Sequence, residues 1–146
     1  MTLAYLFWGS ICAYLLFTLY FTTGLHRLRN NRTPNYLPRV SVVIAARNEA
    51  DTIQELLNDL VQQDYPKEKF DITIVSDRST DGTWNIIQDY SQLHSSVRGI
   101  KIEDTDPQMT PKKRALTCGI EKTSGEVIIS TDGDCSVPTG WIRSMV

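Results

Sequence analysis

The chain has 146 residues and a formal net charge of −2 at pH 7. Nucleic-acid-binding proteins usually carry a clustered basic face, and this nearly neutral chain gives no indication of that function. Its three cysteines form no C-x-x-C pair, so the sequence predicts no disulfide framework and favours reduced thiols in a cytosolic compartment.

The first predicted element is a transmembrane helix over residues 1–25. This stretch contains no charged side chain, and it is long enough for a membrane core that about 20 apolar residues cross. A cleaved signal peptide would carry positive charge ahead of its apolar region, but the opening MTLAYLF carries none. The alternative is a buried helix of a soluble protein, and an uncharged stretch at the chain terminus argues against it.

Basic side chains follow this segment, at His26, Arg27, Arg29 and Arg32. The positive-inside rule therefore predicts one span in the inner (plasma) membrane, with the N-terminus outside and the remainder of the chain in the cytosol. Residues 26–38 are polar and contain proline, which is typical of a linker.

Strands and helices alternate from residue 39 to residue 146. Short apolar runs predict strands over 40–46, 70–76, 99–103 and 126–131. Helices are expected to follow the first three strands and, in short form, the fourth; Asn48 is predicted to cap the first of them. In the helix that begins at Pro111, Ala115, Leu116 and Ile120 are expected to face inward. This order predicts an α/β fold whose mostly parallel sheet has helices on both faces.

Polar clusters follow three of these strands: ARNE at 46–49, SDRSTDGT at 76–83 and TDGDC at 131–135. Ligands of parallel sheets bind beyond the carboxyl ends of the strands, so the three clusters are expected to form one site. Asp77 can accept a hydrogen bond from a nucleobase or a ribose hydroxyl, or it can cap the next helix. Ser79 and Asp81 fit the capping role better.

Asp132 and Asp134 form a D-x-D sequence directly after the fourth strand. Two carboxylates on one turn suit Mg²⁺ or Mn²⁺, which would bridge the phosphates of a nucleoside diphosphate. Lys112 lies in the first turn of a helix, where positive charge opposes the helix dipole. Lys112 is therefore either part of a solvated face or the partner of an anion.

The ordered set of motifs resembles glycosyltransferase family 2, which has the GT-A fold. The matching stretches are VSVVIAARNEADTI, a Tyr-Pro corner, ITIVSDRSTDGT, KKRALTCGI and SGEVIISTDGDCSVP, and they cover about residues 39–145. The N-terminal span and the stretch DYPKEKFDI are most similar to the membrane-bound, processive-synthase-like branch, which implies polysaccharide biosynthesis. The expected architecture is therefore the first half of a Rossmann-like GT-A domain, at residues 39–146, behind one transmembrane helix.

The resemblance implies transfer of a sugar, with inversion, from a UDP- or GDP-linked donor to a glycan or lipid acceptor. It also implies which residues bind the nucleotide sugar and the Mg²⁺ or Mn²⁺ ion. The base and ribose would contact Ala45, Arg47, Glu49 and Asp77. Asp132 would lie near the ribose and the diphosphate, Lys112 would match the family's motif lysine and bind an anion, and the metal would bind Asp132 and Asp134.

Two positions depart from the family pattern. Ser76 stands where the family often has the first of two aspartates, and Arg47 stands where an aromatic residue is common. The family's general base is a carboxylate on a later segment, so we assign no catalytic residue here and expect the base beyond Val146. On this interpretation the chain is truncated and, by itself, inactive in transfer.

Three other functions are alternatives. A sugar-nucleotidyltransferase would carry a glycine-rich loop near the first strand, but residues 45–48 contain no glycine. A receiver-type signalling domain would carry its carboxylates after the first and third strands, whereas here they follow the second and fourth. The third alternative is a scaffold that binds the donor without catalysis.

Overall fold

The computed structural model describes residues 2–30, 36–105 and 107–146. The chain divides into two compact units, Met1–Tyr36 and Leu37–Val146. Of the predicted linker, residues 26–30 belong to a helix and residues 31–35 lie outside the described residues. The two units are taken in turn below.

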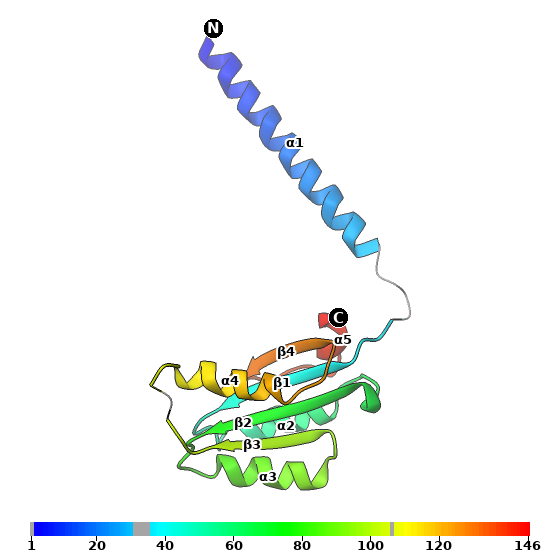
Figure 1. Cartoon of the computed structure of the whole chain (residues 1–146). Coiled ribbons are helices and arrows are strands. Elements are labelled where there is room, and N and C mark those ends of the chain that lie inside the picture. Colours follow the sequence, from blue (N-terminus) through cyan, green and yellow to red (C-terminus); the bar gives the residue numbers. More distant parts are fainter. Residues whose placement is uncertain (1, 31–35, 106) are drawn as a thin grey trace. The chain divides into compact units, whose positions relative to one another are not determined.

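Among its described residues, the first unit contains one helix, α1 (Thr2–Asn30), which extends beyond the predicted end at residue 25 (Figure 1). Within it, Ala4–Arg27 is long and apolar enough to cross a membrane, as judged from length and composition. The hydroxyl groups of Ser10, Thr18, Thr22 and Thr23 bond to the helix's own backbone, as Thr18 does to the carbonyl of Tyr14 at 2.7 Å. Such internal bonds satisfy the polar groups that a bilayer would leave without partners.

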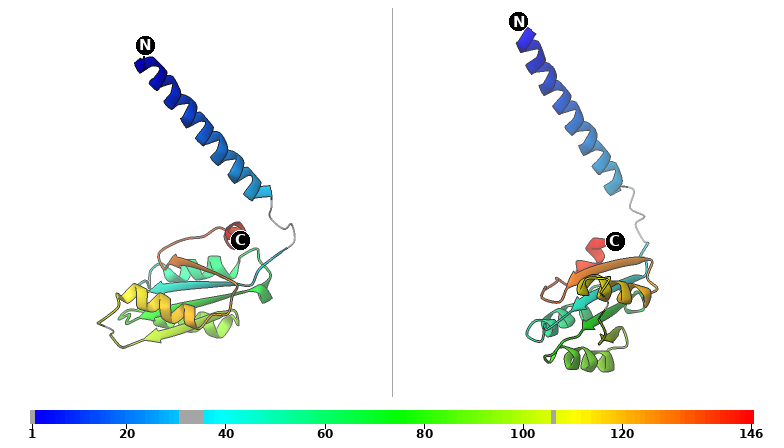
Figure 2. Two further views of the ribbon diagram at one scale, coloured as in Figure 1. Left: turned by 45° about the horizontal axis from the view of Figure 1, so that its top comes forward. Right: turned by 60° about the vertical axis from the view of Figure 1, so that its left-hand side comes forward.

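The second unit is a sheet with helices on both faces (Figures 1 and 2). Its strands are β1 (Val40–Ala46), β2 (Phe70–Asp77), β3 (Val97–Ile102) and β4 (Val127–Asp132), and all neighbouring strands pair in parallel in the order β3-β2-β1-β4. The helices are α2 (Ile53–Val61), α3 (Thr83–Leu93), α4 (Pro111–Glu121) and α5 (Trp141–Met145), with a short 3-10 helix at Lys67–Lys69. The predicted α/β class and parallel sheet are confirmed.

Alternate residues of the central strands face two different layers. Val42 and Ile44 of β1 belong to the core cluster together with the buried side of α2, which consists of Ile53, Leu56, Leu57 and Leu60. The opposite side of β1 faces α4, where a Cβ added at Gly119 would lie 2.5 Å from Val43 Cγ1. This glycine therefore allows α4 to lie directly against the sheet.

Two local predictions are wrong. Asn48 does not cap α2, whose N-cap residue is Thr52; Asn48 instead adopts a left-handed conformation with φ of 56°. Ile120 does not face inward, since 43% of it is exposed, and the buried residues of α4 are Ala115 and Gly119. In both cases contacts with distant segments outweigh the local pattern. The strand ends also move, so that Asp77 and Asp132 are the last residues of β2 and β4.

Candidate functional site

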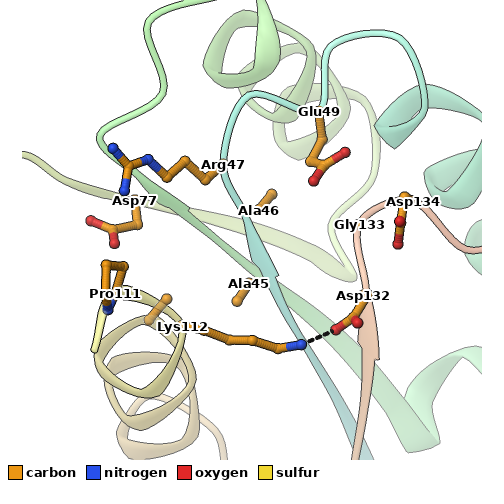
Figure 3. A pocket seen from close by; sticks show the side chains of 11 residues that line it. Ala45, Ala46, Arg47, Glu49, Asp77, Pro111, Lys112, Asp132, Gly133 and Asp134 are labelled. Atoms are coloured by element: carbon orange, nitrogen blue, oxygen red, sulfur yellow. Dashed lines mark ion pairs between the residues drawn. The ribbon is translucent and has the colours of Figure 1, made fainter. Parts of the chain in front are cut away.

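A pocket of about 260 Å³ opens where β1, β2 and β4 end and α4 begins (Figure 3). The seven residues that the sequence predicted for the site all line it, although their predicted roles are not tested by this placement. The lining residues are Ala45, Ala46, Arg47, Glu49, Asp77, Pro111, Lys112, Ala115, Asp132, Gly133 and Asp134. Polar clusters separated by more than 80 positions in the chain thus meet at one edge of the sheet.

The turn after β1, which carries Arg47 and Glu49, is fixed by the turn after β2. The Asn48 side-chain oxygen accepts a hydrogen bond from the Thr80 backbone N–H at 2.8 Å. The Glu49 backbone N–H donates to the Thr83 hydroxyl at 2.8 Å. The left-handed conformation of Asn48, which asparagine tolerates better than most residues, directs the chain into this contact. This wall of the pocket is therefore held by side chains that link the turn after β1 to the turn after β2.

Asp77 is the buried charged group of the pocket and has two arginine partners. Arg114 Nη2 donates to Asp77 Oδ1 at 2.5 Å, and Arg78 Nε donates to the same oxygen at 2.9 Å. The Asp77 side chain is only 3% exposed. Burial alone would raise the pKa of this carboxyl, but the hydrogen bonds from Arg78 and Arg114 outweigh it and hold the pKa below its usual range. Asp77 is therefore a fixed, ionised hydrogen-bond acceptor.

Lys112 and Asp132 form an ion pair across the mouth of the pocket, with 2.7 Å between Nζ and Oδ1 (Figure 3). Both side chains are more than half exposed, so solvent screens the pair. The hydrogen bond to Asp132 raises the pKa of the Lys112 ammonium above its ordinary value. Lys112 thus has an anionic partner, and a ligand with its own negative charge can compete for it.

Asp132 ends β4 and Asp134 lies on the turn that follows, with Gly133 between them. A Cβ added at Gly133 would come within 3.2 Å of Glu49 Cγ, so the glycine lets this turn lie close to the turn after β1. Among the described residues, no three His, Cys, Asp or Glu side chains are grouped as a metal site. Two hard oxygen donors do fit Mg²⁺ or Mn²⁺ if ligand phosphates complete the coordination. The donor set is thus suited to a metal that arrives with a diphosphate.

Arg114 is the functional contact that the sequence did not predict. In the sequence it appears only within the stretch KKRALTCGI, yet its side chain is 13% exposed and ion-paired with Asp77. Its Nε is buried and has no hydrogen-bond partner among the described atoms. Helical spacing gives no signal for this contact, because residues three and four apart share a face, and the buried Ala115 lies three residues after the exposed Lys112 but only one after Arg114.

Comparison with known proteins gives one consistent family. Residues 41–146 match the sequence model of Glycosyl transferase family 2. Glycosyltransferase AglE of Haloferax volcanii is 39% identical over 107 residues, which are 73% of this chain and 34% of that protein. The beta-monoglucosyldiacylglycerol synthase of Nostoc sp. is 30% identical over 151 residues, covering 95% of this chain and 31% of the synthase. The chain spans about a third of the length of these two relatives.

Solved structures of similar proteins have the same fold. The mannosyltransferase PcManGT from Pyrobaculum calidifontis, in complex with GDP-Man and Mn²⁺, matches with a TM-score of 0.62 and 32% identity over 72% of this chain and 30% of that one. S. aureus TarS 1–349 in complex with UDP-GlcNAc matches with a TM-score of 0.61 and 27% identity over 73% of this chain and 30% of that one. These neighbours confirm the GT-A-like sheet and show nucleotide-sugar donors bound to similar proteins.

Proposed function

The chain belongs to glycosyl transferase family 2, and we propose that it carries the donor-binding part of an inverting glycosyltransferase. In this proposal the enzyme transfers a sugar from a UDP- or GDP-linked donor to a glycan or lipid acceptor. The observation that carries it is the convergence of a buried carboxylate, an exposed lysine and a D-x-D turn around one pocket. Such convergence at the carboxyl ends of parallel strands is the usual location of a nucleotide site.

The nucleoside binds on the side of Asp77. Its carboxylate is held by Arg78 and Arg114 before any ligand arrives, so it can accept a hydrogen bond from a base N–H or a ribose hydroxyl without reorganising. Arg47 lies above it on the turn after β1, Glu49 of the same turn lies beside Gly133, and Ala45 lines the wall between the two sides (Figure 3). The planar guanidinium of Arg47 can stack on a base where other family members use an aromatic ring.

The diphosphate binds between Lys112 and the D-x-D turn. Lys112 exchanges its ion pair with Asp132 for the phosphates, and the freed Asp132 and Asp134 supply carboxylate oxygens for Mg²⁺ or Mn²⁺. When bound, the metal neutralises charge that develops on the nucleoside diphosphate leaving group. This use of Asp132 and Asp134 is consistent with the Pyrobaculum calidifontis enzyme, whose structure is a complex with GDP-Man and Mn²⁺.

The general base for the acceptor hydroxyl lies outside this pocket. Asp77 is held in the ionised form by two arginines, which makes it a weak base. Asp132 and Asp134 are engaged with the lysine and the metal in this assignment. The carboxylate that takes the acceptor's proton is therefore none of Asp77, Asp132 and Asp134.

The helix α1 anchors the protein in a membrane, with the transferase domain on the cytosolic side. Its length and composition support this proposal, as do the basic side chains that follow its apolar part. A related protein is named for a lipid product, beta-monoglucosyldiacylglycerol, so a lipid acceptor at the membrane surface fits the same arrangement. Assignment to a processive polysaccharide synthase remains a prediction.

The test is calorimetric binding of UDP and GDP to the full chain, with and without Mn²⁺. We expect at least one nucleotide to bind, and Mn²⁺ to strengthen its binding in the wild type but not in Asp134→Ala. Asp104→Ala removes an exposed carboxylate outside the pocket and serves as the control for charge. Equal affinity of wild type and Asp134→Ala in the presence of Mn²⁺ would refute the assignment of the D-x-D turn.

A further inference from the structure

We propose that Asp59, on α2, is a positioning residue for the metal-binding side of the pocket. It lies outside the pocket but holds the segment that follows Asp134, and so keeps the Asp134 carboxylate where a metal–diphosphate complex can reach it. This inference rests on the proposed function, because it assigns Asp59 a part in the binding of the same donor.

The segment between β4 and α5 has little regular structure of its own. It leaves the sheet at Asp132, turns through Asp134 and runs without strand pairing to α5, which begins at Trp141. Within the turn, the backbone contact from Cys135 N–H to the Asp132 carbonyl is long, at 3.4 Å. The position of Asp134 therefore depends on what holds the chain beyond it.

Asp59 makes the first contacts that hold the chain after Asp134. One carboxylate oxygen, Oδ2, accepts hydrogen bonds from the Ser136 hydroxyl at 2.8 Å and from the Val137 backbone N–H at 3.0 Å. These two donors lie two and three residues after Asp134. Val137 is buried in the core cluster, so the anchored segment cannot shift freely. The anchor is thus close enough to Asp134 to set the direction of the turn.

Gln63, four residues after Asp59 on the chain, holds the remainder of the segment. Its amide nitrogen donates to the Pro138 carbonyl at 2.8 Å and to the Asp59 carbonyl at 3.1 Å, and its oxygen accepts from the Ile142 N–H at 3.0 Å. Gln63 is only 3% exposed. Its buried amide has hydrogen-bond partners on α2 and on the segment between β4 and α5, which makes the α5 end of that segment rigid. Asp59 is the nearer, partly exposed anchor, and its removal should loosen the turn without opening the core.

The affinity of a protein for a metal ion depends on the neighbouring groups that hold the metal-binding side chains in position. Loss of such a supporting hydrogen bond typically lowers metal affinity about 10–100-fold. The nucleoside side of the pocket does not depend on this segment, because Asp77 is fixed by Arg78 and Arg114. A positioning role for Asp59 therefore predicts loss of the metal-dependent part of nucleotide affinity, with the metal-free part retained.

The experiment compares UDP and GDP affinity, with and without Mn²⁺, in the full-length wild type, Asp59→Ala and Asp59→Asn. Alanine removes both hydrogen bonds, whereas the asparagine carbonyl can accept both at the same place. We expect the gain in affinity from Mn²⁺ to fall about 10–100-fold in Asp59→Ala and to be largely restored in Asp59→Asn. Glu55→Ala removes an exposed carboxylate one turn earlier on α2 and should behave as the wild type.

The outcomes separate this inference from the proposed function. An unchanged Mn²⁺ effect in Asp59→Ala would overturn the inference, as would an equal loss of metal-free and metal-dependent binding, which indicates a purely structural role. Should Asp59→Ala fail to fold, Ser136→Ala removes one of the two hydrogen bonds and must show a smaller loss of the same kind; no loss there also overturns it. A wild type that binds neither nucleotide contradicts the proposed function instead.

Discussion

Replacement of Arg114 by methionine should destabilise the protein through the buried Asp77 carboxylate. Methionine occupies the space of the arginine stem but donates no hydrogen bond. The bond from Arg114 Nη2 to Asp77 Oδ1 is 2.5 Å long, and Asp77 is almost fully buried. Removing one partner of a buried ion pair costs about 3–5 kcal/mol when the charge is left uncompensated. Because Arg78 still pairs with Asp77 in the variant, we expect the free energy of unfolding to fall by the value of one hydrogen bond to a charged group, about 1.5–3 kcal/mol.

The assay is urea unfolding of the full chain at neutral pH, followed by near-ultraviolet circular dichroism. Lys113→Met is the control, since it removes the neighbouring, exposed cation from the same turn of α4. Surface substitutions of that kind usually change the free energy of unfolding by less than about 0.5 kcal/mol. A loss in Arg114→Met no larger than in Lys113→Met would refute the reasoning.

The effect should also depend on pH in a definite direction. The folded-state pKa of Asp77 is held below its ordinary value, so its ionised carboxylate stabilises the fold above the unfolded-state pKa of about 3.9. That stabilisation is lost as the pH falls from there through the folded-state pKa. The difference in unfolding free energy between wild type and Arg114→Met should therefore be constant near neutral pH and shrink below about pH 4. If the difference in unfolding free energy grew as the pH was lowered, an ionisable group other than Asp77 would be responsible for it.

Two further predictions concern the phosphate side and the membrane. Lys112→Ala should lower UDP or GDP affinity several-fold, and the loss should be larger at low salt than at high salt because salt screens an exposed ammonium. Lys113→Ala should leave the affinity unchanged, and equal losses in the two variants would contradict a specific role for Lys112. A reporter fused after Val146 should be active only in its cytosolic form, because basic residues follow the apolar part of α1, and a signal confined to the outside would reverse the assigned topology.

The sheet and the site could be predicted from the sequence because both follow from simple periodic patterns. Buried parallel strands are continuous apolar runs, and polar residues at their ends must gather at one edge. That reasoning was sufficient to predict that Asp77, Asp132 and Asp134 lie close together, without any knowledge of the loops. The strand ends themselves shifted by only a few residues.

What the sequence did not reveal are contacts whose partners are distant in the chain. Asn48 has the side chain of a helix cap, but its oxygen binds the backbone of Thr80 instead, 32 residues away. Arg114 has two lysines before it in the sequence and no local feature that distinguishes it from them, yet it is ion-paired with Asp77, 37 residues away. No sequence pattern distinguishes Gly119, yet its lack of a side chain allows α4 to approach Val43. Each depends on which surfaces the folded sheet brings together, and local propensity contains no information about that.

The two sides of the pocket are held in different ways, and this has consequences for binding. Asp77 is buried between two arginines, whereas the side chain of Asp132 is 56% exposed and its partner Lys112 is exposed as well. A group that is already fixed loses little freedom when a ligand binds, while an exposed group must be ordered by the ligand. The nucleoside side should therefore provide most of the affinity without metal, and the D-x-D turn should contribute only when metal and diphosphate arrive together. For that reason Arg114→Met should weaken binding in both conditions, whereas Asp59→Ala and Asp134→Ala should act only in the presence of Mn²⁺.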